Sequence, residues 1–338
     1  MDKFDCIQTN ETSTQGETHS YNNAIELYAL WSQTLSKRNS LCFLSAFMNL
    51  SSTDKRWKSA LIVYYDFEFS GNIRHNFGTQ CSIHQIAAQC KNETFFCQIN
   101  PYLSKETVEP PVDTKYFMPS KEDFLKENAY TFKEGYEQFI SFILRLLLKR
   151  KKKWVCLISH NGFRGDKIVL EHELLYHGLQ PVGFYFMDSL LYIRETYPGL
   201  QSYSLENIYE KMFGENYYAH NAKTDTKALF QIMKKINRPL HGVLYPMLSV
   251  PWRNVAGIGY HSEQSMLQFG IFDLTSLFVF TQGNLQKTKI VLARAGVLIS
   301  EKLMENIFHW YKHAKTVLLY RHESVQIAAN STLPLDRT

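Results

Sequence analysis

Hydrophobic and polar positions follow two different periods along the chain, and each period predicts one kind of element. Short runs rich in β-branched and aromatic residues predict strands near 61–68, 80–88, 95–99, 154–159 and 183–187. Apolar stripes with a period near 3.6 predict helices at about 134–149, 166–177, 202–213 and 220–236. Strands that come first and then alternate with helices predict an α/β fold with a mixed sheet flanked by helices.

Two acidic residues, Asp66 and Glu68, end the apolar run LIVYYDFEFSG. Residues two apart on a strand point the same way, so both carboxylates converge on one side while Phe67 faces the other. Convergent carboxylates are a ligand set for a hard divalent cation such as Mg²⁺. Taken alone, the pair is equally well explained as a strand end with two solvated acids.

A third acid, Asp166, begins a helix in the run WVCLISHNGFRGDKIVLEHELL. It shares the inward, apolar stripe of that helix with Val169, Leu170 and Leu174. An inward Asp at a helix start is often a capping or ion-paired residue.

The run NYYAHNAKTDTKALFQIMKKI repeats this arrangement. His220 precedes a helix that Asn221 is expected to cap, and Asp225 lies in the first turn on the face of Leu229 and Ile232. Two such helices together with the strand pair favour a single site over coincidence.

This series of residues resembles the DEDDh 3′→5′ exonucleases of the DnaQ-like, or RNase T-like, superfamily. The resemblance rests on Asp66-x-Glu68, on Asp166 in HNGFRGD, and on His220 and Asp225 in HNAKTD, and it covers roughly residues 59–236. HNGFRGDKIVLEHEL and SYSLENIYEKMFGENYYAHNAKTDTKAL are most similar to the TREX-type branch and to the exonuclease domain of some promyelocytic leukaemia (PML) proteins. An RNase H-like sheet is implied.

The resemblance also implies roles for the five residues. Asp66, Glu68 and Asp225 hold two Mg²⁺ ions, for which Mn²⁺ can substitute, and Asp166 completes the metal site. Two metals about 3.5–4 Å apart stabilise both the attacking and the leaving oxygen of a phosphodiester. His220 takes the proton of the attacking water, a task that suits an imidazole, whose ordinary pKa is about 6.5.

One departure from the family pattern concerns terminal-nucleotide recognition. Members usually carry Thr after the motif-one Glu, and this chain has Phe69 there, followed by Ser70 and Gly71. The metal ligands are intact, but Phe69 either stacks on a base or simply fills space.

The expected reaction is removal of nucleotides from 3′ ends. Single-stranded or 3′-ended DNA is the favoured substrate because of the TREX-like resemblance. RNA stays open as the substrate of an exoribonuclease, since no clear reader of the 2′-OH is visible. An interaction module with a silent exonuclease-like fold is the alternative from another class. The intact set of five residues argues against it.

Length and composition predict three segments. They are a partly disordered, then helical extension (1–58), the exonuclease domain (59–240) and a helical tail (241–338). The net charge of +5 mildly favours a polyanionic partner. The six cysteines show no zinc-binding spacing and suggest reduced thiols, hence a nuclear or cytoplasmic protein. No signal-peptide core or membrane span is evident, and the oligomeric state is left open.

Three features outside the five residues carry weaker signals. The basic run 149–153 fits exposed charge at a helix C-terminus, a nuclear localisation signal or a phosphate-contacting patch. Asp188 is expected to cap the helix that follows it. Gly257-Ile258-Gly259 resembles half of a helix-hairpin-helix, whose glycine turn presents N–H groups to a phosphate, or is an ordinary turn.

Overall fold

The computed structural model describes residues 48–71, 73, 81–105, 120–126, 129–179 and 181–330. The disorder expected in the first twenty residues lies outside the described part. So do nearly all of the helices expected between 23 and 50, whose last three residues form a strand instead.

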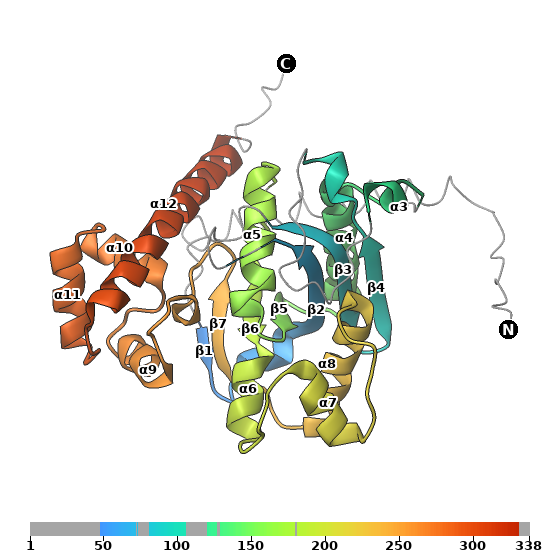
Figure 1. The fold of residues 1–338 in the computed structure, drawn as a ribbon, viewed down its shortest axis with the longest axis horizontal. Helices are drawn as coiled ribbons and strands as arrows, with labels where there is room; N and C mark the ends of the chain where they lie inside the picture. The colour runs from blue at the N-terminus through green and yellow to red at the C-terminus, as the bar shows by residue number, and fades with distance from the viewer. Residues whose placement is uncertain are drawn as a thin grey trace, which may run out of the picture.

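A seven-stranded mixed sheet runs through the described residues, as Figure 1 shows, and it confirms the expected α/β, RNase H-like architecture. Its strands lie in the order β1-β7-β6-β5-β2-β3-β4. The three central strands are parallel, and the outer pairings are antiparallel. The strands are β1 (Met48–Leu50), β2 (Ala60–Ser70), β3 (Ser82–Cys90), β4 (Glu93–Gln98), β5 (Trp154–Ser159), β6 (Tyr185–Asp188) and β7 (Gly242–Pro246).

Helices cover both faces of this sheet. On one face α4 (Phe132–Lys149) and α5 (Asp166–Tyr176) pack on alternate residues of β2 such as Val63 and Tyr65. On the other face α6 (Ser189–Thr196), α7 (Leu205–Phe213) and α8 (Ala222–Ile236) cover Ile158 of β5 and its neighbours. Shorter elements are α3 (Lys121–Lys126) and the 3₁₀-helices η1 (Lys55–Ser59), η2 (Pro101–Leu103) and η3 (Gly162–Arg164).

Local capping explains why these helices begin where they do. Asp188, Ser204 and Asn221 are the N-caps of α6, α7 and α8, and each accepts a hydrogen bond from a backbone N–H of its helix. The caps predicted at Asp188 and Asn221 are therefore confirmed.

Two strands fall outside the segment that the sequence analysis assigned to the exonuclease domain. β7 lies in the residues expected to form a helical tail, and β1 lies in the expected N-terminal extension. Both complete the sheet, because β7 pairs with β6 on one side and with β1 on the other. Leu244 and Tyr245 of β7 are fully buried, so these residues belong to the core.

The C-terminal helices form a second core beside the sheet (Figure 1). They are η4 (Trp252–Asn254), α9 (Tyr260–Gln268), α10 (Leu274–Thr281), α11 (Leu285–Arg294) and α12 (Glu301–Asn330). Leu303 and Trp310 of α12 are buried there. Ile168 of α5 belongs to the same core, so the tail packs directly on the sheet domain.

Polar contacts reinforce this junction. Lys167 is fully buried, pairs with Glu171, and donates to the carbonyl of Ser249 at 2.6 Å. Arg164 donates to the carbonyl of Arg253 at 2.9 Å. Removing one partner of a buried ion pair is strongly destabilising, because it leaves an uncompensated buried charge. These contacts therefore make the junction part of the fold.

The Gly257-Ile258-Gly259 turn takes part in this packing. Gly257 has φ +95°, and a Cβ there would lie 3.4 Å from Leu303 Cδ1. The element before the turn is the three-residue η4 rather than a full helix, and Ile258 is buried. The turn thus serves packing between η4, α9 and α12, which is the ordinary-turn interpretation. Phosphate binding by it stays a prediction.

The basic run lies away from the end of β2 that carries the acid pair. It precedes β5, and β2 and β5 are parallel, so the run lies at the opposite end of these strands from the acid pair. Lys149 and Arg150 both pair with Glu93, at 3.1 and 3.5 Å. Their position at the end of α4 agrees with helix C-terminal charge.

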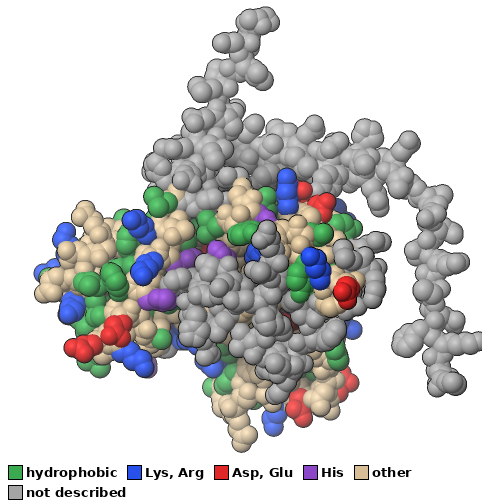
Figure 2. Space-filling model, turned by 45° about the horizontal axis from the view of Figure 1, so that its top comes forward, with side chains coloured by type: hydrophobic (Ala, Val, Ile, Leu, Met, Phe, Trp, Pro, Cys, Tyr) green, Lys and Arg blue, Asp and Glu red, His purple; other side chains and the backbone are tan. Residues whose placement is uncertain are grey.

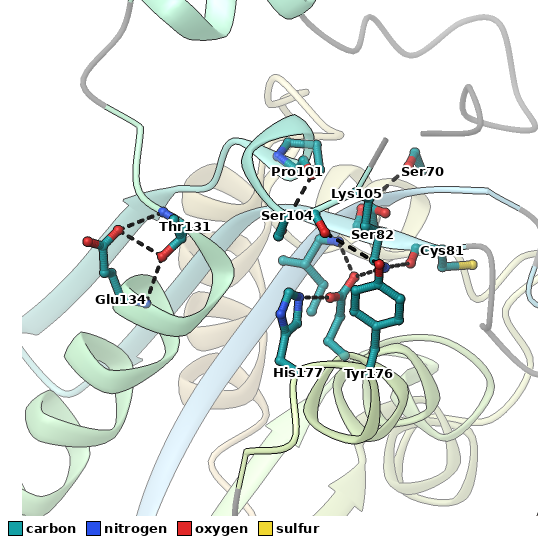
Figure 3. A network of polar contacts seen from close by, with 12 residues as sticks. Ser70, Cys81, Ser82, Pro101, Ser104, Lys105, Thr131, Glu134, Tyr176 and His177 are labelled. Atoms are coloured by element: carbon teal, nitrogen blue, oxygen red, sulfur yellow. Dashed lines mark hydrogen bonds and ion pairs between the residues drawn. The ribbon is translucent and has the colours of Figure 1, made fainter. Parts of the chain in front are cut away.

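A buried ion pair fixes the beginning of β3 against α5. Lys105 donates to Glu173 at 2.7 Å and to the carbonyl of Cys81 at 2.8 Å, and His177 lies 3.1 Å from the same Glu173. Figure 3 shows Lys105, Cys81 and His177 close to Tyr176, which is the last residue of α5; Lys105 follows η2 and Cys81 precedes β3. The contacts explain how a lysine is buried here, and they hold the β3 end of the sheet.

On the surface, hydrophobic and basic side chains alternate over the C-terminal helices (left in Figure 2). Val279, Phe280 and Leu298 are among the exposed apolar residues there. Within the described part of the chain, no helix has both the length and the apolar character needed to span a membrane.

Candidate metal centre

Asp66, Glu68 and Asp225 come together at one point of the fold. One carboxylate oxygen from each lies within 4.8 Å of the other two. Asp66 and Glu68 extend from the face of β2 that α8 covers, and Asp225 faces them from the first turn of α8. The strand pair and the second helix therefore meet as the sequence predicts, and we refer to these three residues as the acidic cluster.

The register of β2 and β3 changes immediately after Glu68. Glu68 lies opposite Gln85, whereas Phe69 lies opposite Ile83, so one residue of β3 is skipped. Such a bulge bends the strand and redirects the side chains beside it. The extra residue is His84 of β3, and the register is regular from Asp66 to Glu68, so ordinary strand alternation directs both acids to the cluster.

Hydrogen bonds fix the N-terminus of α8 over this strand. Gln85 of β3 accepts from the backbone N–H of Ala222 at 3.1 Å. Asn221 caps the helix, and its own N–H donates to Asp225 Oδ2 at 3.1 Å. One oxygen of Asp225 is thereby oriented by the backbone.

Asp166 lies beside the acidic cluster and holds the strand that carries it. Its Oδ1 accepts from the backbone N–H of Phe67 at 2.9 Å. β5 pairs with β2 only as far as Tyr64, so the Phe67 N–H lies beyond the last strand partner on that side. Asp166 supplies the missing acceptor, and it is not among the three residues whose oxygens converge.

The loop before Asp166 requires glycine. A Cβ on Gly162 would lie 1.7 Å from Ser159 Oγ and 3.3 Å from Asp166 Oδ2. Any side chain there would push the end of β5 away from Asp166. Gly162, the first glycine of HNGFRGD, thus has a steric role in placing Asp166.

Asp188 positions the same loop, which the sequence analysis did not predict. Besides capping α6, it accepts from the backbone N–H groups of Asn161 and Phe163 at 2.9 and 3.3 Å. Burial raises the pKa of Asp188 to about 6, although these N–H groups oppose the shift. Asp188 therefore affects the acidic cluster only through the loop that it holds. In the sequence, the only sign of this role was that Asp188 follows a predicted strand.

Repulsion among the acids characterises the centre. Burial raises the pKa of Asp66 well above its usual range, and the charges of Asp166, Asp225 and Glu68 raise it further. Burial and the charges of Asp225 and Asp166 raise the pKa of Glu68 to about 8. The pKa of Asp225 is raised by burial as well. Divalent cations relieve such repulsion, and an all-carboxylate donor set suits Mg²⁺ or Mn²⁺.

His220 lies at the rim of the centre, directly before the cap of α8. Its backbone has φ +62°, and its ring is exposed. Nε2 is 3.4 Å from Glu206 Oε1 at the start of α7. The His220 charge also lowers the pKa of Asp225, against the larger effect of burial. The ring therefore contacts Glu206, and its charge is close enough to the acidic cluster to act on Asp225.

Tyr217 is a neighbour of the cluster that sequence reasoning missed. Its hydroxyl is buried and lies close enough to Asp225 to lower the pKa of that carboxyl, although the geometry falls short of a regular hydrogen bond. Burial raises the pKa of Tyr217 strongly, and the charges of Asp225 and Asp66 add to the effect. A neutral donor therefore faces the acids. In the sequence, Tyr217 and Tyr218 stand shortly before His220, and nothing in that pattern indicates that Tyr217 faces the acids.

Phe69 packs against the hydrophobic core and points toward the loop that carries Asp166. It lies partly buried, and its Cζ would be 3.8 Å from a Cβ on Gly165. These contacts agree with the space-filling alternative. Base stacking by Phe69 stays untested.

The raised pKa values predict how stability depends on pH without divalent cations. The folded chain keeps the Glu68 proton up to about pH 8, whereas the unfolded chain loses it near 4.5. Across that window the folded state binds more protons, so stability falls as pH rises. Mg²⁺ binds the ionised form, and we expect its increase in Tm to grow with pH. Thermal melts with EDTA or Mg²⁺ check this, and Glu68→Gln should flatten both trends.

Comparison with known proteins finds a relative that matches part of the chain. No protein-family model matches the chain. Over 81 residues the chain is 35% identical to a protein named Uncharacterized exonuclease R569, from Acanthamoeba polyphaga mimivirus. The match covers 23% of this chain and 24% of the mimivirus protein. The chain therefore aligns with about a quarter of that relative's length.

Proposed function

We propose that this protein is a metal-dependent 3′→5′ exonuclease that hydrolyses phosphodiester bonds at the 3′ ends of nucleic acids. The observation that carries the proposal is the convergence of Asp66, Glu68 and Asp225 within 4.8 Å on an RNase H-like sheet. The partial similarity to a protein named an exonuclease supports the nuclease class. The 3′→5′ polarity rests on the DEDDh resemblance.

Each acidic residue has a role in this proposal. Asp66, Glu68 and Asp225 would hold the divalent cations, and Asp166 keeps β2 in place through the Phe67 N–H. Bound Mg²⁺ or Mn²⁺ would supply Lewis-acid stabilisation of charge on the phosphate and the leaving oxygen. The carboxylates must be ionised to bind metal, and a cation favours that form against the repulsion described above.

His220 is proposed as the general base. Rotation about its side chain would exchange Glu206 for a water near the acidic cluster, since the ring is exposed and lies at the rim. Geometry in a substrate-free site is often looser than in the reacting complex. The Glu206 contact therefore keeps the imidazole at the rim of the acidic cluster that would hold the cations.

DNA with a single-stranded 3′ end is the proposed substrate, on the TREX-like resemblance. RNA is the alternative, and an inactive binding module is the alternative of another class. One assay separates all three: 3′-labelled and 5′-labelled single-stranded DNA and RNA, incubated with Mg²⁺ or with EDTA. Release of labelled mononucleotide from the 3′-labelled strands supports the proposal, whereas endonucleolytic products or no cleavage contradict it.

Replacing His220 with Ala is expected to lower turnover by about 10²–10⁴-fold, the usual contribution of a positioned base. Metal binding should persist, because the carboxylates are unchanged. Steady-state rates together with Mg²⁺-dependent Tm shifts measure the two effects. A matched control is His241→Ala, since His241 also pairs with an exposed glutamate, Glu195. Wild-type turnover in His220→Ala would assign the residue a structural role.

A further inference from the structure

A groove runs along the outer flank of α8, between this helix and the β3–β4 edge of the sheet. We call it the α8 groove; it is lined by Gln89, Thr94, Phe95, Lys223, Thr226 and Lys227, with Ala87 and Ala88 at its floor. Its volume is about 280 Å³. Ligand pockets usually measure about 300–1,000 Å³, so the groove is sized for one small group. Figure 1 draws α8 beside β3 and β4.

The α8 groove adjoins the acidic cluster without being part of it. Ala87 at its floor is the strand partner of Asp66, one strand away. Thr226 in its wall follows Asp225 in the chain. Groove and cluster therefore lie on two sides of the first turns of α8. A chain that ends at the cluster can pass over the helix start and enter the groove.

The wall of the groove contains a hydroxyl without a partner. Thr226 is 2% exposed, and its Oγ1 makes no hydrogen bond with any described residue. Buried polar groups are nearly always hydrogen-bonded, and leaving one unpaired is unfavourable. The hydroxyl is a donor suited to an anionic oxygen or to a water that such an oxygen orders.

The charges of the groove are of one sign. Lys223 and Lys227 are both exposed and stand one helical turn apart on α8. Like charges at this spacing destabilise a helix slightly. No carboxylate is among the described residues that line the groove. Two lysines without a carboxylate beside them in the groove, together with the free donor of Thr226, are suited to binding a polyanion.

An exposed aromatic ring lies near Lys223, next in the chain to the lining residue Phe95. Phe96 of β4 is 39% exposed, and Lys223 Nζ lies 6.0 Å from its ring centroid. An exposed ring beside a lysine is the combination with which proteins bind single-stranded nucleic acid, by stacking a base and contacting the backbone.

We propose that the α8 groove binds the single strand upstream of the 3′ end, with Lys223 and Lys227 on its phosphates and Phe96 against a base. Thr226 donates to the phosphate that lies deepest. This inference rests on the proposed function, and it deepens it by giving the substrate a path: a strand several nucleotides long, single-stranded where it crosses α8.

The first test removes the charges. Lys223→Gln/Lys227→Gln is compared with Lys211→Gln/Lys234→Gln, which removes two exposed lysines outside the groove. Binding of a labelled single-stranded oligonucleotide is measured against salt in EDTA. Two lost phosphate contacts should flatten the slope of log K on log salt by roughly 1.4, at about 0.7 each for single strands. The control pair should keep the wild-type slope.

The same variants are tested kinetically. A long strand reaches the groove and a dinucleotide does not, so wild-type protein should show a lower KM for the long strand. The groove variant should lose that advantage, whereas the control pair keeps it. Equal slopes and an intact KM advantage in the groove variant would overturn the inference. If the wild-type protein cleaves neither substrate, the proposed function fails instead.

The second test uses the hydroxyl. Thr226→Val keeps the shape of the side chain and removes the oxygen. If Thr226 serves the strand, affinity for the oligonucleotide falls while Tm stays or rises, since an unpaired buried polar atom is gone. Unchanged affinity would contradict the place of this hydroxyl in the groove, whatever the change in Tm.

Discussion

Asp225→Asn is expected to lower turnover by at least about 100-fold while the protein stays folded. Changes to residues that merely support metal ligands already cost about 10–100-fold, and Asp225 is a member of the converging set itself. Asn keeps an oxygen to accept the Asn221 N–H, so the start of α8 should hold. The change removes the negative charge and little else.

The stability of this variant gives a second readout. Asp225 raises the pKa values of Asp66 and Glu68, so its charge destabilises the metal-free centre. Without divalent cations, Asp225→Asn should therefore melt at or above the wild-type temperature. With Mg²⁺ the order should reverse, because only the wild type retains the full ligand set.

Glu210→Gln serves as the matched control, because it removes one exposed acid from the neighbouring helix α7. It should leave turnover and the Mg²⁺ effect as in the wild type. Full activity of Asp225→Asn, or full activity of the wild type in EDTA, would mean that the acidic cluster is not the catalytic centre.

The elements that position this cluster are readable from sequence because local signals specify them. β5 occupies the predicted residues 154–159, and α5 and α8 begin within two residues of their predicted starts. Strand alternation places Asp66 and Glu68 together, and helix periodicity turns Asp225 inward. These properties depend only on neighbours in the chain.

Features that depend on distant residues were not predictable in this way. The bulge after Glu68 reflects pairing with β3, and the Phe67–Asp166 bond arises because β5 ends before β2 does. The place of Tyr217 depends on how the loop before α8 packs. β7 was missed because Gly242 and Pro246 stand at its two ends, and both residue types are depleted in strands.

Truncation after residue 240 is expected to leave no stable, folded protein. The cut removes β7, which pairs with β6 and β1 and buries Leu244 and Tyr245. It also removes the Ser249 carbonyl and the Leu248 N–H, which bind the buried pair Lys167 and Glu171. An unsatisfied buried group costs about 1–3 kcal/mol, and charged groups cost more. Against a typical stability of about 5–15 kcal/mol, these losses are decisive.

A chain ending at residue 250 separates the sheet from the helical tail. It keeps β7 and the partners of Lys167 and Glu171. It loses the core that meets Ile168, the Arg253 carbonyl that accepts from Arg164, and Glu263, which accepts from the Tyr245 hydroxyl. We expect this shorter protein to fold with a lower Tm, measured by circular dichroism melts and size-exclusion chromatography. A stable, active chain ending at 240 would show that the fold closes before β7. If the chain ending at 250 unfolds as completely as the one ending at 240, the helices of the tail carry the stability instead.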